Sequence, residues 1–216
     1  AHDRNGNLTY DMELQTDFAY NSLNLLEKAM RNDTIVAKYS YLADGTKLSA
    51  VNADDCGFAY RGSFTYRADA GGDRVFESTP FGGGRIVGTV DDETEVRYFL
   101  TDHLGRTRVV AKVTPTGRED LDRKDYYPFG KEWAQPDMPT SDNRYTFSGK
   151  EKQHLRFQEI DYADFEARFY DSETGIFLQQ DPLSEYSFQV SPYAYCGNNP
   201  INRIDLDGKR WDDPIQ

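Results

Sequence analysis

The sequence predicts an all-β protein, in which an antiparallel meander of β-hairpins leads into a loop-rich C-terminal core of short strands. Aromatic residues make up 14% of the chain, with 15 Tyr and 13 Phe. These residue types favour half-buried strand positions over a helical core. Turn-forming Asn, Asp, Gly and Pro residues separate short apolar runs along the whole chain. In the first half, one strand–turn–strand pattern also returns several times, which is the mark of a repeat architecture.

The repeated unit has an aromatic strand end, a polar turn and a second strand that opens with Thr, Lys or Leu. Asn-Gly and Asp-Gly pairs accept the positive φ angles that tight turns require. Alternating Tyr and Phe residues lie on one face of a sheet and can pair across strands. We therefore expect hairpins at residues 2–9, 18–26, 39–48 and 97–106.

One segment leaves a helical alternative open. Residues 17–30 place Leu23, Leu26 and Met30 on one helical face, but Asn21, Ser22 and Asn24 interrupt that pattern. We prefer strand–turn–strand there. Residues 69–73 and 82–84 are glycine-rich and indicate hairpin turns or loops. The triple glycine lacks the Lys and Ser or Thr that a phosphate-binding loop needs.

The sequence divides the chain into four expected regions. Residues 1–132 form the hairpin region, 133–143 a Pro- and Asp-rich exposed loop, 144–209 the C-terminal core and 210–216 a tail. Residues 114–122 are expected to be a polar connection, and a short helix is expected to begin at Glu151. The start of the chain lacks Met and suggests a fragment of something longer.

Charge and cysteine content exclude several classes of function. The net charge is −12, which repels phosphate backbones and argues against nucleic-acid binding. The basic stretch from Arg106 to Lys124 is interrupted by acidic residues. Cys56 and Cys196 fit no metal spacing, and we expect two unlinked thiols, although a single bridge stays open. No apolar run is long enough to span a bilayer.

Familiar catalytic patterns are absent from the sequence. The three histidines, His2, His103 and His154, do not lie in a nucleophile-elbow context, and no zinc-ligand spacing occurs. We expect His103 to be a turn residue, and we expect neither metal nor cofactor. The remaining candidates are Asp181 and Asp205. Two carboxylates brought together share a proton, so one acts as general base and the other as general acid. In the alternative interpretation, both only form turns.

Several motifs resemble the RHS-repeat-associated core domain of the Rhs/YD-repeat polymorphic toxin family. Tyr10-Asp11 is a literal copy of the pair that names the YD repeat. The other matching motifs, in chain order, are Asp102-His103-Leu104-Gly105, Tyr127-Pro128-Phe129-Gly130, Ala167 to Asp171, Glu173-Thr174-Gly175, Phe177-Leu178, Asp181-Pro182-Leu183, Tyr193-Ala194-Tyr195, Asn198-Asn199-Pro200, Asn202 and Asp205 to Gly208.

The resemblance implies a fold and two roles. In this family the repeats wind into a large hollow β-shell, of which this chain would be a part. The first role is a non-catalytic carrier that encloses a C-terminal toxin, the passenger, belonging to a longer parent chain. The second is an enzyme: many members cut their own chain with an aspartyl-protease-like pair, which maps here to Asp181 and Asp205. Gly208 and Lys209 would form the cleavage site, and the cut would fall after Lys209, which replaces the family's Leu, while Leu206 replaces its Pro.

A third role is a cell-surface adhesion module that binds carbohydrate or protein through an exposed Tyr-rich face. The resemblance also implies a bacterial protein that is secreted or lies at the cell surface. Its expected partners are the passenger, a delivery machine or a surface ligand. Open sheet edges suggest self-association between copies.

Overall fold

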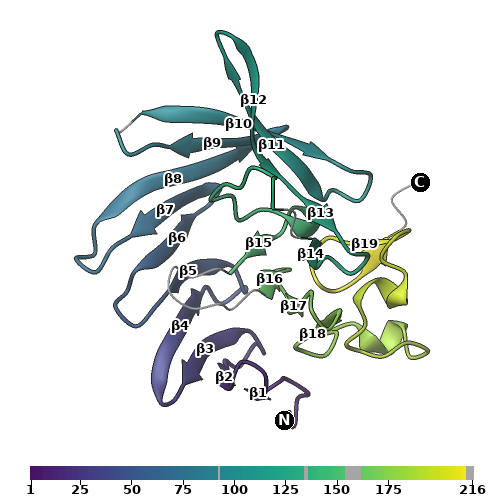
Figure 1. The fold of residues 1–216 in the computed structure, drawn as a ribbon. Helices are drawn as coiled ribbons and strands as arrows, with labels where there is room; N and C mark the ends of the chain where they lie inside the picture. Colours follow the sequence, from purple (N-terminus) through teal and green to yellow (C-terminus); the bar gives the residue numbers. More distant parts are fainter. Residues whose placement is uncertain (92, 134–135, 154–161, 213–216) are drawn as a thin grey trace.

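The structure is a computed structural model that describes residues 1–91, 93–133, 136–153 and 162–212. Twelve strands form one sheet in which each strand pairs with its sequence neighbours, from β1 to β12, and every pairing is antiparallel. β1 and β12 are the two edges, so the sheet is open (Figure 1). The strands are β1 (Tyr10–Asp11), β2 (Thr16–Tyr20), β3 (Leu26–Arg31), β4 (Thr34–Tyr41), β5 (Lys47–Val51), β6 (Gly57–Arg61), β7 (Phe64–Ala68), β8 (Arg74–Phe81), β9 (Gly84–Gly88), β10 (Thr94–Thr101), β11 (Thr107–Thr114) and β12 (Gly117–Arg123).

A recurring side-chain-supported turn explains why this chain meanders. In the turn after β10, the carboxylate of Asp102 accepts hydrogen bonds from the backbone N–H of Leu104 (2.9 Å) and Arg106 (3.1 Å). Gly105 supplies the positive φ of 71° that closes the turn. The same arrangement, with Asn or Asp first and a positive-φ residue fourth, recurs in the turns that begin at Asp3, Asn21, Asn52 and Asp69.

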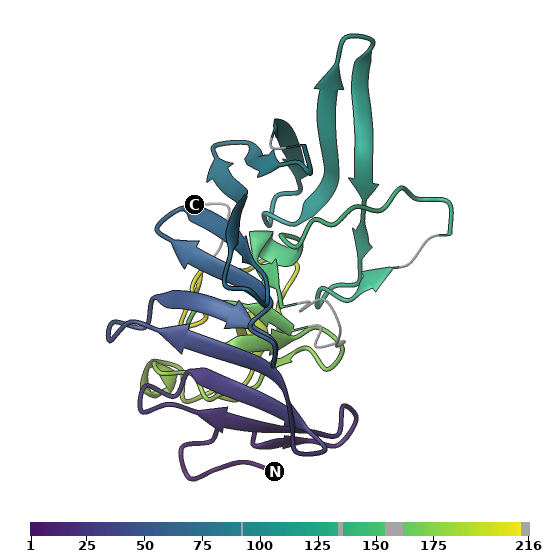
Figure 2. The ribbon, with the colours of Figure 1, turned by 90° about the vertical axis from the view of Figure 1, so that its left-hand side faces the viewer.

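The C-terminal region, residues 125–212, is built from short strands and single 3-10 turns that lie against one face of the sheet (Figures 1 and 2). A four-stranded sheet, β15 to β18, forms its centre, with two-stranded ribbons β13–β14 and β19–β20 beside it. The elements are β13 (Asp125–Tyr126), β14 (Glu132–Trp133), η1 (Phe147–Gly149), β15 (Glu151–Lys152), β16 (Tyr162–Asp164), β17 (Phe169–Asp171), β18 (Ile176–Phe177), η2 (Ser184–Tyr186), η3 (Tyr195–Asn198), β19 (Ile204–Asp205) and β20 (Trp211–Asp212).

Two apolar clusters fix the C-terminal region in place. The first joins the sheet to that region: Phe18 and Tyr39 of the sheet contact the rings of Tyr162 and Phe169, with centroid distances of 6.1 and 5.3 Å. The second lies within the C-terminal region and is mostly aromatic, with Phe147, Phe165, Tyr170, Phe177 and Tyr195 in mutual contact. The short strands are therefore stabilised by burial of large rings rather than by long ladders.

The all-β prediction is confirmed, and several local predictions can be compared. Residues 17–30 form β2, a turn and β3, so the helical alternative is wrong. Residues 69–73 and 82–83 form hairpin turns. The expected connection at 114–122 is wrong, because Gly117–Arg123 is the edge strand β12. A helix does not begin at Glu151, since Glu151–Lys152 is β15, and residues 154–156 of that expected helix lie outside the described residues.

Cys56 and Cys196 are free thiols, so they are not bridged. Within the described ranges, the structure has no helix with the length and apolar character needed to cross a membrane.

Candidate functional site

The two aspartates predicted as a pair lie in different loops of the C-terminal region. Asp181 follows β18, where its N–H donates to the carbonyl of Pro192 at 2.9 Å and its carboxylate accepts from the N–H of Leu183 at 2.8 Å. Asp205 ends β19, and its carboxylate accepts from the N–H of Asp207 (3.2 Å) and Gly208 (2.7 Å). Both side chains thus form turns, as the alternative interpretation expected.

Arg168 brings the two aspartates together. One guanidinium nitrogen, Nη2, lies 3.2 Å from Asp181 Oδ2 and 3.5 Å from Asp205 Oδ2. Its Nη1 donates to the carbonyl of Pro192 at 3.0 Å, and the guanidinium lies 3.7 Å above the ring centroid of Phe177. The Arg168 side chain is 2% exposed and Asp205 is 1% exposed, so this ion-paired cluster is buried. In this arrangement a guanidinium, rather than a shared proton, holds the carboxylates together.

The predicted cleavage residues lie beside the same cluster. Arg168 Nε donates a hydrogen bond to the carbonyl oxygen of Gly208. The backbone of Gly208 has a positive φ of 71°. The Lys209 side chain points away from the cluster: it is 47% exposed, and its Nζ lies 3.5 Å from the Asp207 carboxylate. The structure therefore brings Asp181, Asp205 and Gly208 onto one guanidinium and leaves Lys209 at the surface.

The electrostatic balance in the cluster favours a protonatable Asp205. Burial raises the pKa of Asp205 above its ordinary value, and this effect outweighs the attraction of Arg168 and the backbone N–H donors. Burial also lowers the pKa of Arg168, against the pull of both aspartates. A carboxyl group that takes a proton more readily than usual can serve as a general acid, so the cluster has one property that acid–base chemistry requires.

A cavity of about 670 Å³ opens between the turns of the sheet and the C-terminal region. Its walls come from the β4–β5 turn, the β6–β7 turn, the segment that leads into β15 and the segment that follows β16, and Pro182 and Lys209 also line it. The cavity is within the usual size range for small-ligand sites. The predicted cleavage residue Lys209 therefore lines a cavity on the covered side of the sheet.

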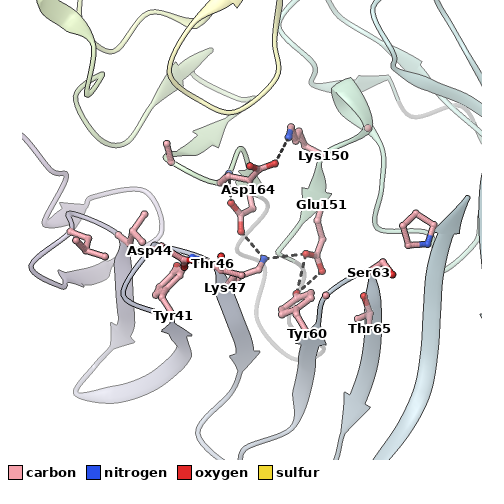
Figure 3. Close-up of a pocket in the computed structure, with 18 of the residues that line it drawn as sticks. Tyr41, Asp44, Thr46, Lys47, Tyr60, Ser63, Thr65, Lys150, Glu151 and Asp164 are labelled. Carbon is pink, nitrogen blue, oxygen red and sulfur yellow. Dashed lines mark hydrogen bonds and ion pairs between the residues drawn. The ribbon is translucent and has the colours of Figure 1, made fainter. Parts of the chain in front are cut away.

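An ion-pair network forms the floor of this cavity (Figure 3). Lys47 Nζ on β5 lies 2.6 Å from Asp164 Oδ2 and 3.1 Å from Glu151 Oε2. The hydroxyl of Tyr60 donates to Glu151 Oε1 at 2.8 Å, and Arg144 pairs with the same carboxylate. Burial alone would lower the pKa of Lys47, but the attraction of Asp164 and the other partners outweighs this effect and raises the pKa. The network thus links sheet strands to the C-terminal region and neutralises its own charges.

Sequence reasoning missed this network and the role of Arg168. The available signal for Arg168 was a single cation between Phe165 and Phe169, in a run that is otherwise apolar or aromatic apart from Glu166. Lys47 lies more than a hundred positions before Glu151 and Asp164, so the network carried no local signal. The prediction for His103 is confirmed, since its Nε2 lies 3.2 Å from the carbonyl of Ile201 at a turn. His154 lies outside the described residues.

Comparison with known proteins finds related sequences. No protein-family model matches the chain. The tRNA3(Ser)-specific nuclease WapA of Bacillus spizizenii is 25% identical over 96% of this chain, and the tRNA nuclease WapA of Bacillus subtilis is 26% identical over the same share. Salivary gland surface protein 1 of Aedes aegypti is 33% identical over 52% of this chain. The chain spans 9% of the length of each of these WapA proteins and 3% of the Aedes protein.

Solved structures share the fold. A chain in the crystal structure of TcdB2-TccC3-Cdc42 matches 96% of this chain with a TM-score of 0.75 and 17% identity, over 11% of its own length. A chain in the Photorhabdus luminescens Tc holotoxin pore matches the same share with a TM-score of 0.77 and 17% identity, over 10% of its length. The resemblance of this chain to the core of the Rhs/YD-repeat toxin family is therefore confirmed, in sequence by the WapA relatives and in fold by the Tc toxin chains.

Proposed function

We propose that this chain is a carrier segment of an Rhs/YD-repeat toxin, which encloses a passenger polypeptide belonging to a longer parent chain. The observation that carries the proposal is the position of the C-terminal region. It lies on one face of the open meander, and the residues leading to Asp212 run along that same side (Figure 1). A polypeptide continuing from there starts on the covered face of the sheet.

Docking of the C-terminal region supports this role. Phe18, Tyr39, Tyr162 and Phe169 bury rings between the two parts, and Lys47 bridges carboxylates across the same boundary. A carrier needs such a fixed exit direction, because a passenger attached to a loosely held segment would swing to either face. We accordingly propose a division of labour between regions: the hairpin region encloses the passenger, the core at 144–209 fixes its exit direction, and the loop at 133–143 joins the two.

Limited proteolysis of the longer natural protein tests the carrier role. We expect the polypeptide that follows Gln216 to resist trypsin until the meander itself unfolds. A matched variant, Lys47→Met, removes the ion pairs at the docking boundary and should expose the passenger at lower urea concentration. If the passenger is digested as fast in the native protein as in isolation, the carrier role is wrong.

Self-cleavage is the second candidate function, and the cluster around Arg168 favours it. Asp181 and Asp205 meet at one guanidinium, the pKa of Asp205 is raised by burial, and the carbonyl of Gly208 is held by Arg168. Two features weigh against efficient cleavage. Arg168 holds both carboxylates, and the Lys209 side chain is exposed and ion-paired with Asp207 instead of filling an apolar pocket.

Intact mass of the longer protein separates the two candidates. Self-cleavage predicts a species that ends near Lys209 and disappears in the Asp205→Asn variant. A single uncut mass supports the carrier role and indicates that Asp181 and Asp205 have a structural role only. The proposal also includes secretion or delivery to the cell surface of a bacterium, with the passenger and a delivery machine as partners.

A further inference from the structure

The face of the large sheet that carries the apolar side chains differs between its first and its last strands. On β2 to β6 the buried apolar residues, among them Phe18, Leu26 and Tyr39, face the C-terminal region. On β10 the alternation is inverted: Val96, Tyr98 and Leu100 are 41, 43 and 41% exposed, whereas Glu95 and Arg97 lie on the covered face. The same orientation of β10 brings Arg97 to Asp142, a residue of the C-terminal region, with which it forms an ion pair at 2.6 Å.

Cross-strand register extends the exposed apolar side over neighbouring strands. Val96 pairs with Ile86, and Tyr98 pairs with Ala111. The rings of Phe81 and Tyr98 meet edge to face at 5.7 Å, which places both on this side. We call this surface the outer patch. Its exposed members are Phe64 (47%), Phe81 (38%), Val96 (41%), Tyr98 (43%), Leu100 (41%) and Val113 (72%).

Four arginines lie around the outer patch. Arg61 pairs in register with Phe64, and Arg123 with Val109, at opposite sides of the surface. Arg74 lies on the same face of β8, and Arg118 on the same face of β12. Arg118 pairs with Asp120, which is the one acidic strand residue that the register of β6 to β12 places on this face. Within the described part of the chain, no ion pair is found for Arg61, Arg74 or Arg123, and all three are exposed.

The patch is therefore apolar at its centre and basic at its rim, on a chain whose net charge is −12. A contiguous exposed apolar surface with a polar rim marks a site of protein interaction. We propose that the outer patch docks a separate protein whose contact surface is apolar in the middle and acidic at its edge. The charge of the rim selects such a partner over a basic one.

Three other occupants fit the surface less well. A second copy of this chain would bring the arginine rim against itself, because a two-fold interface pairs a surface with its own copy. A bilayer requires side chains that insert about 5–10 Å, whereas the side chains of the outer patch, apart from Val113, are less than half exposed. The chain's own C-terminal region occupies the opposite face (Figure 2).

The dimensions of the patch set the expected strength of docking. Seven strands about 4.8 Å apart, with five residues of about 3.4 Å each, cover roughly 570 Å². A standard interface takes about 800 Å² from each partner. We therefore expect a weak, transient complex rather than a permanent one.

Binding of designed peptides tests the proposal. The probe is a peptide that alternates Leu or Val with Glu, and its match replaces every Glu with Lys. We expect the acidic peptide to bind the ¹⁵N-labelled 216-residue chain, with amide shifts centred on Val96 to Leu100, and at least tenfold more tightly than the basic one. Equal binding of the two peptides, or shifts located elsewhere, would overturn the proposal.

Variants localise the effect. Combining Val96→Thr, Tyr98→Thr and Leu100→Thr keeps β propensity and should weaken binding at least tenfold. The control pair Met30→Thr and Ile35→Thr, on the same face of β3 and β4, should leave the affinity within twofold. If the triple variant does not fold, Arg61→Gln with Arg123→Gln replaces it, and only the affinity for the acidic peptide should fall.

Two further measurements decide between occupants. Vesicles of phosphatidylcholine with phosphatidylglycerol should not bind, and binding that the triple variant abolishes would assign the patch to lipid instead. Sedimentation equilibrium should show a monomer. A dimer that the triple variant dissociates would assign the patch to a second copy.

Discussion

Gly208 is the residue whose replacement should be least tolerated in the Arg168 cluster. Its φ is +71°, and a Cβ there would lie 2.8 Å from the carbonyl oxygen of Phe165. We expect Gly208→Ala to lower the free energy of unfolding by about 3 kcal/mol, because a strained φ and a backbone clash both contribute. Urea unfolding followed by tryptophan fluorescence measures the change.

Gly62 provides the matched control. It also has a positive φ, of 60°, but nothing lies within 4 Å of the position that a Cβ would take. Gly62→Ala should therefore cost only about 1 kcal/mol, from the backbone conformation alone. Equal losses in the two variants would show that the close approach to Phe165 does not limit this turn.

Asp205 makes stability depend on pH in a defined direction. Because burial raises its pKa above the ordinary 3.8, the folded chain binds this proton more tightly than the unfolded chain does. The contribution of Asp205 to stability is therefore present below that ordinary value and is lost as pH rises through the raised one. The stability difference between wild type and Asp205→Asn should accordingly shrink as pH rises from 3.5 toward neutrality, a range we choose to bracket both values.

The difference between the two proteins is the informative quantity. Other carboxyl groups, among them Asp11, Glu95, Glu132 and Asp142, have lowered pKa values and give the opposite slope in the total stability. Subtracting the variant's stability at each pH removes their contribution. A difference that grows with pH would mean that the charged form of Asp205 is the favoured one in the fold.

The sequence predicted part of this residue-scale picture. The turn roles of Asp181 and Asp205 follow from neighbouring Pro and Gly residues, which act locally. Their meeting at Arg168 could not be derived from the residues, because the three come from separate turns that only the packed C-terminal region brings together. Local chemistry was thus visible in the sequence, while the partner of the two carboxylates was not.

At the scale of elements, the Asn- or Asp-supported turns are the most testable feature. Asp102→Ala removes the acceptor for the N–H groups of Leu104 and Arg106 and should cost about 1–2 kcal/mol. Asp102→Asn keeps an acceptor oxygen and should cost less than about 0.5 kcal/mol. Thermal unfolding of the two variants checks this. Equal losses would show that charge, and not hydrogen bonding, supports the turn.

The strands were predictable wherever their turns were. Asn21, Asp69 and the glycines at 82–84 mark turns whose chemistry is local, so β2, β3 and the turns that join β7, β8 and β9 were predicted. β12 was missed because Arg118 to Arg123 is a charged run, and an edge strand tolerates charge that a central strand would not. β15 was missed because its two residues are held by pairing with β16 rather than by their own propensity.

At the scale of the whole molecule, the sequence indicated a meander but not what covers it. Docking of the C-terminal region depends on contacts between residues more than a hundred positions apart, such as Lys47 with Glu151 and Tyr162 with Asp11. Such contacts leave no periodic signal. The exchange of faces between β6 and β10 was also hidden, because alternation alone does not say which face is covered.

The ion pairs of Lys47 should carry much of the stability that links the two parts of the molecule. Lys47→Met leaves the carboxylates of Glu151 and Asp164, which are 9 and 8% exposed, short of a cation. We expect a loss of about 3–5 kcal/mol, because an unpaired buried charge is costly. Lys38→Met is the matched control: its partner Asp55 is 70% exposed, so the loss should stay below about 1 kcal/mol. Urea unfolding measures both, and limited proteolysis should show that residues 162–212 become cleavable first in Lys47→Met. Similar losses in the two variants would mean that ring packing alone, around Phe18 and Tyr39, holds the C-terminal region against the sheet.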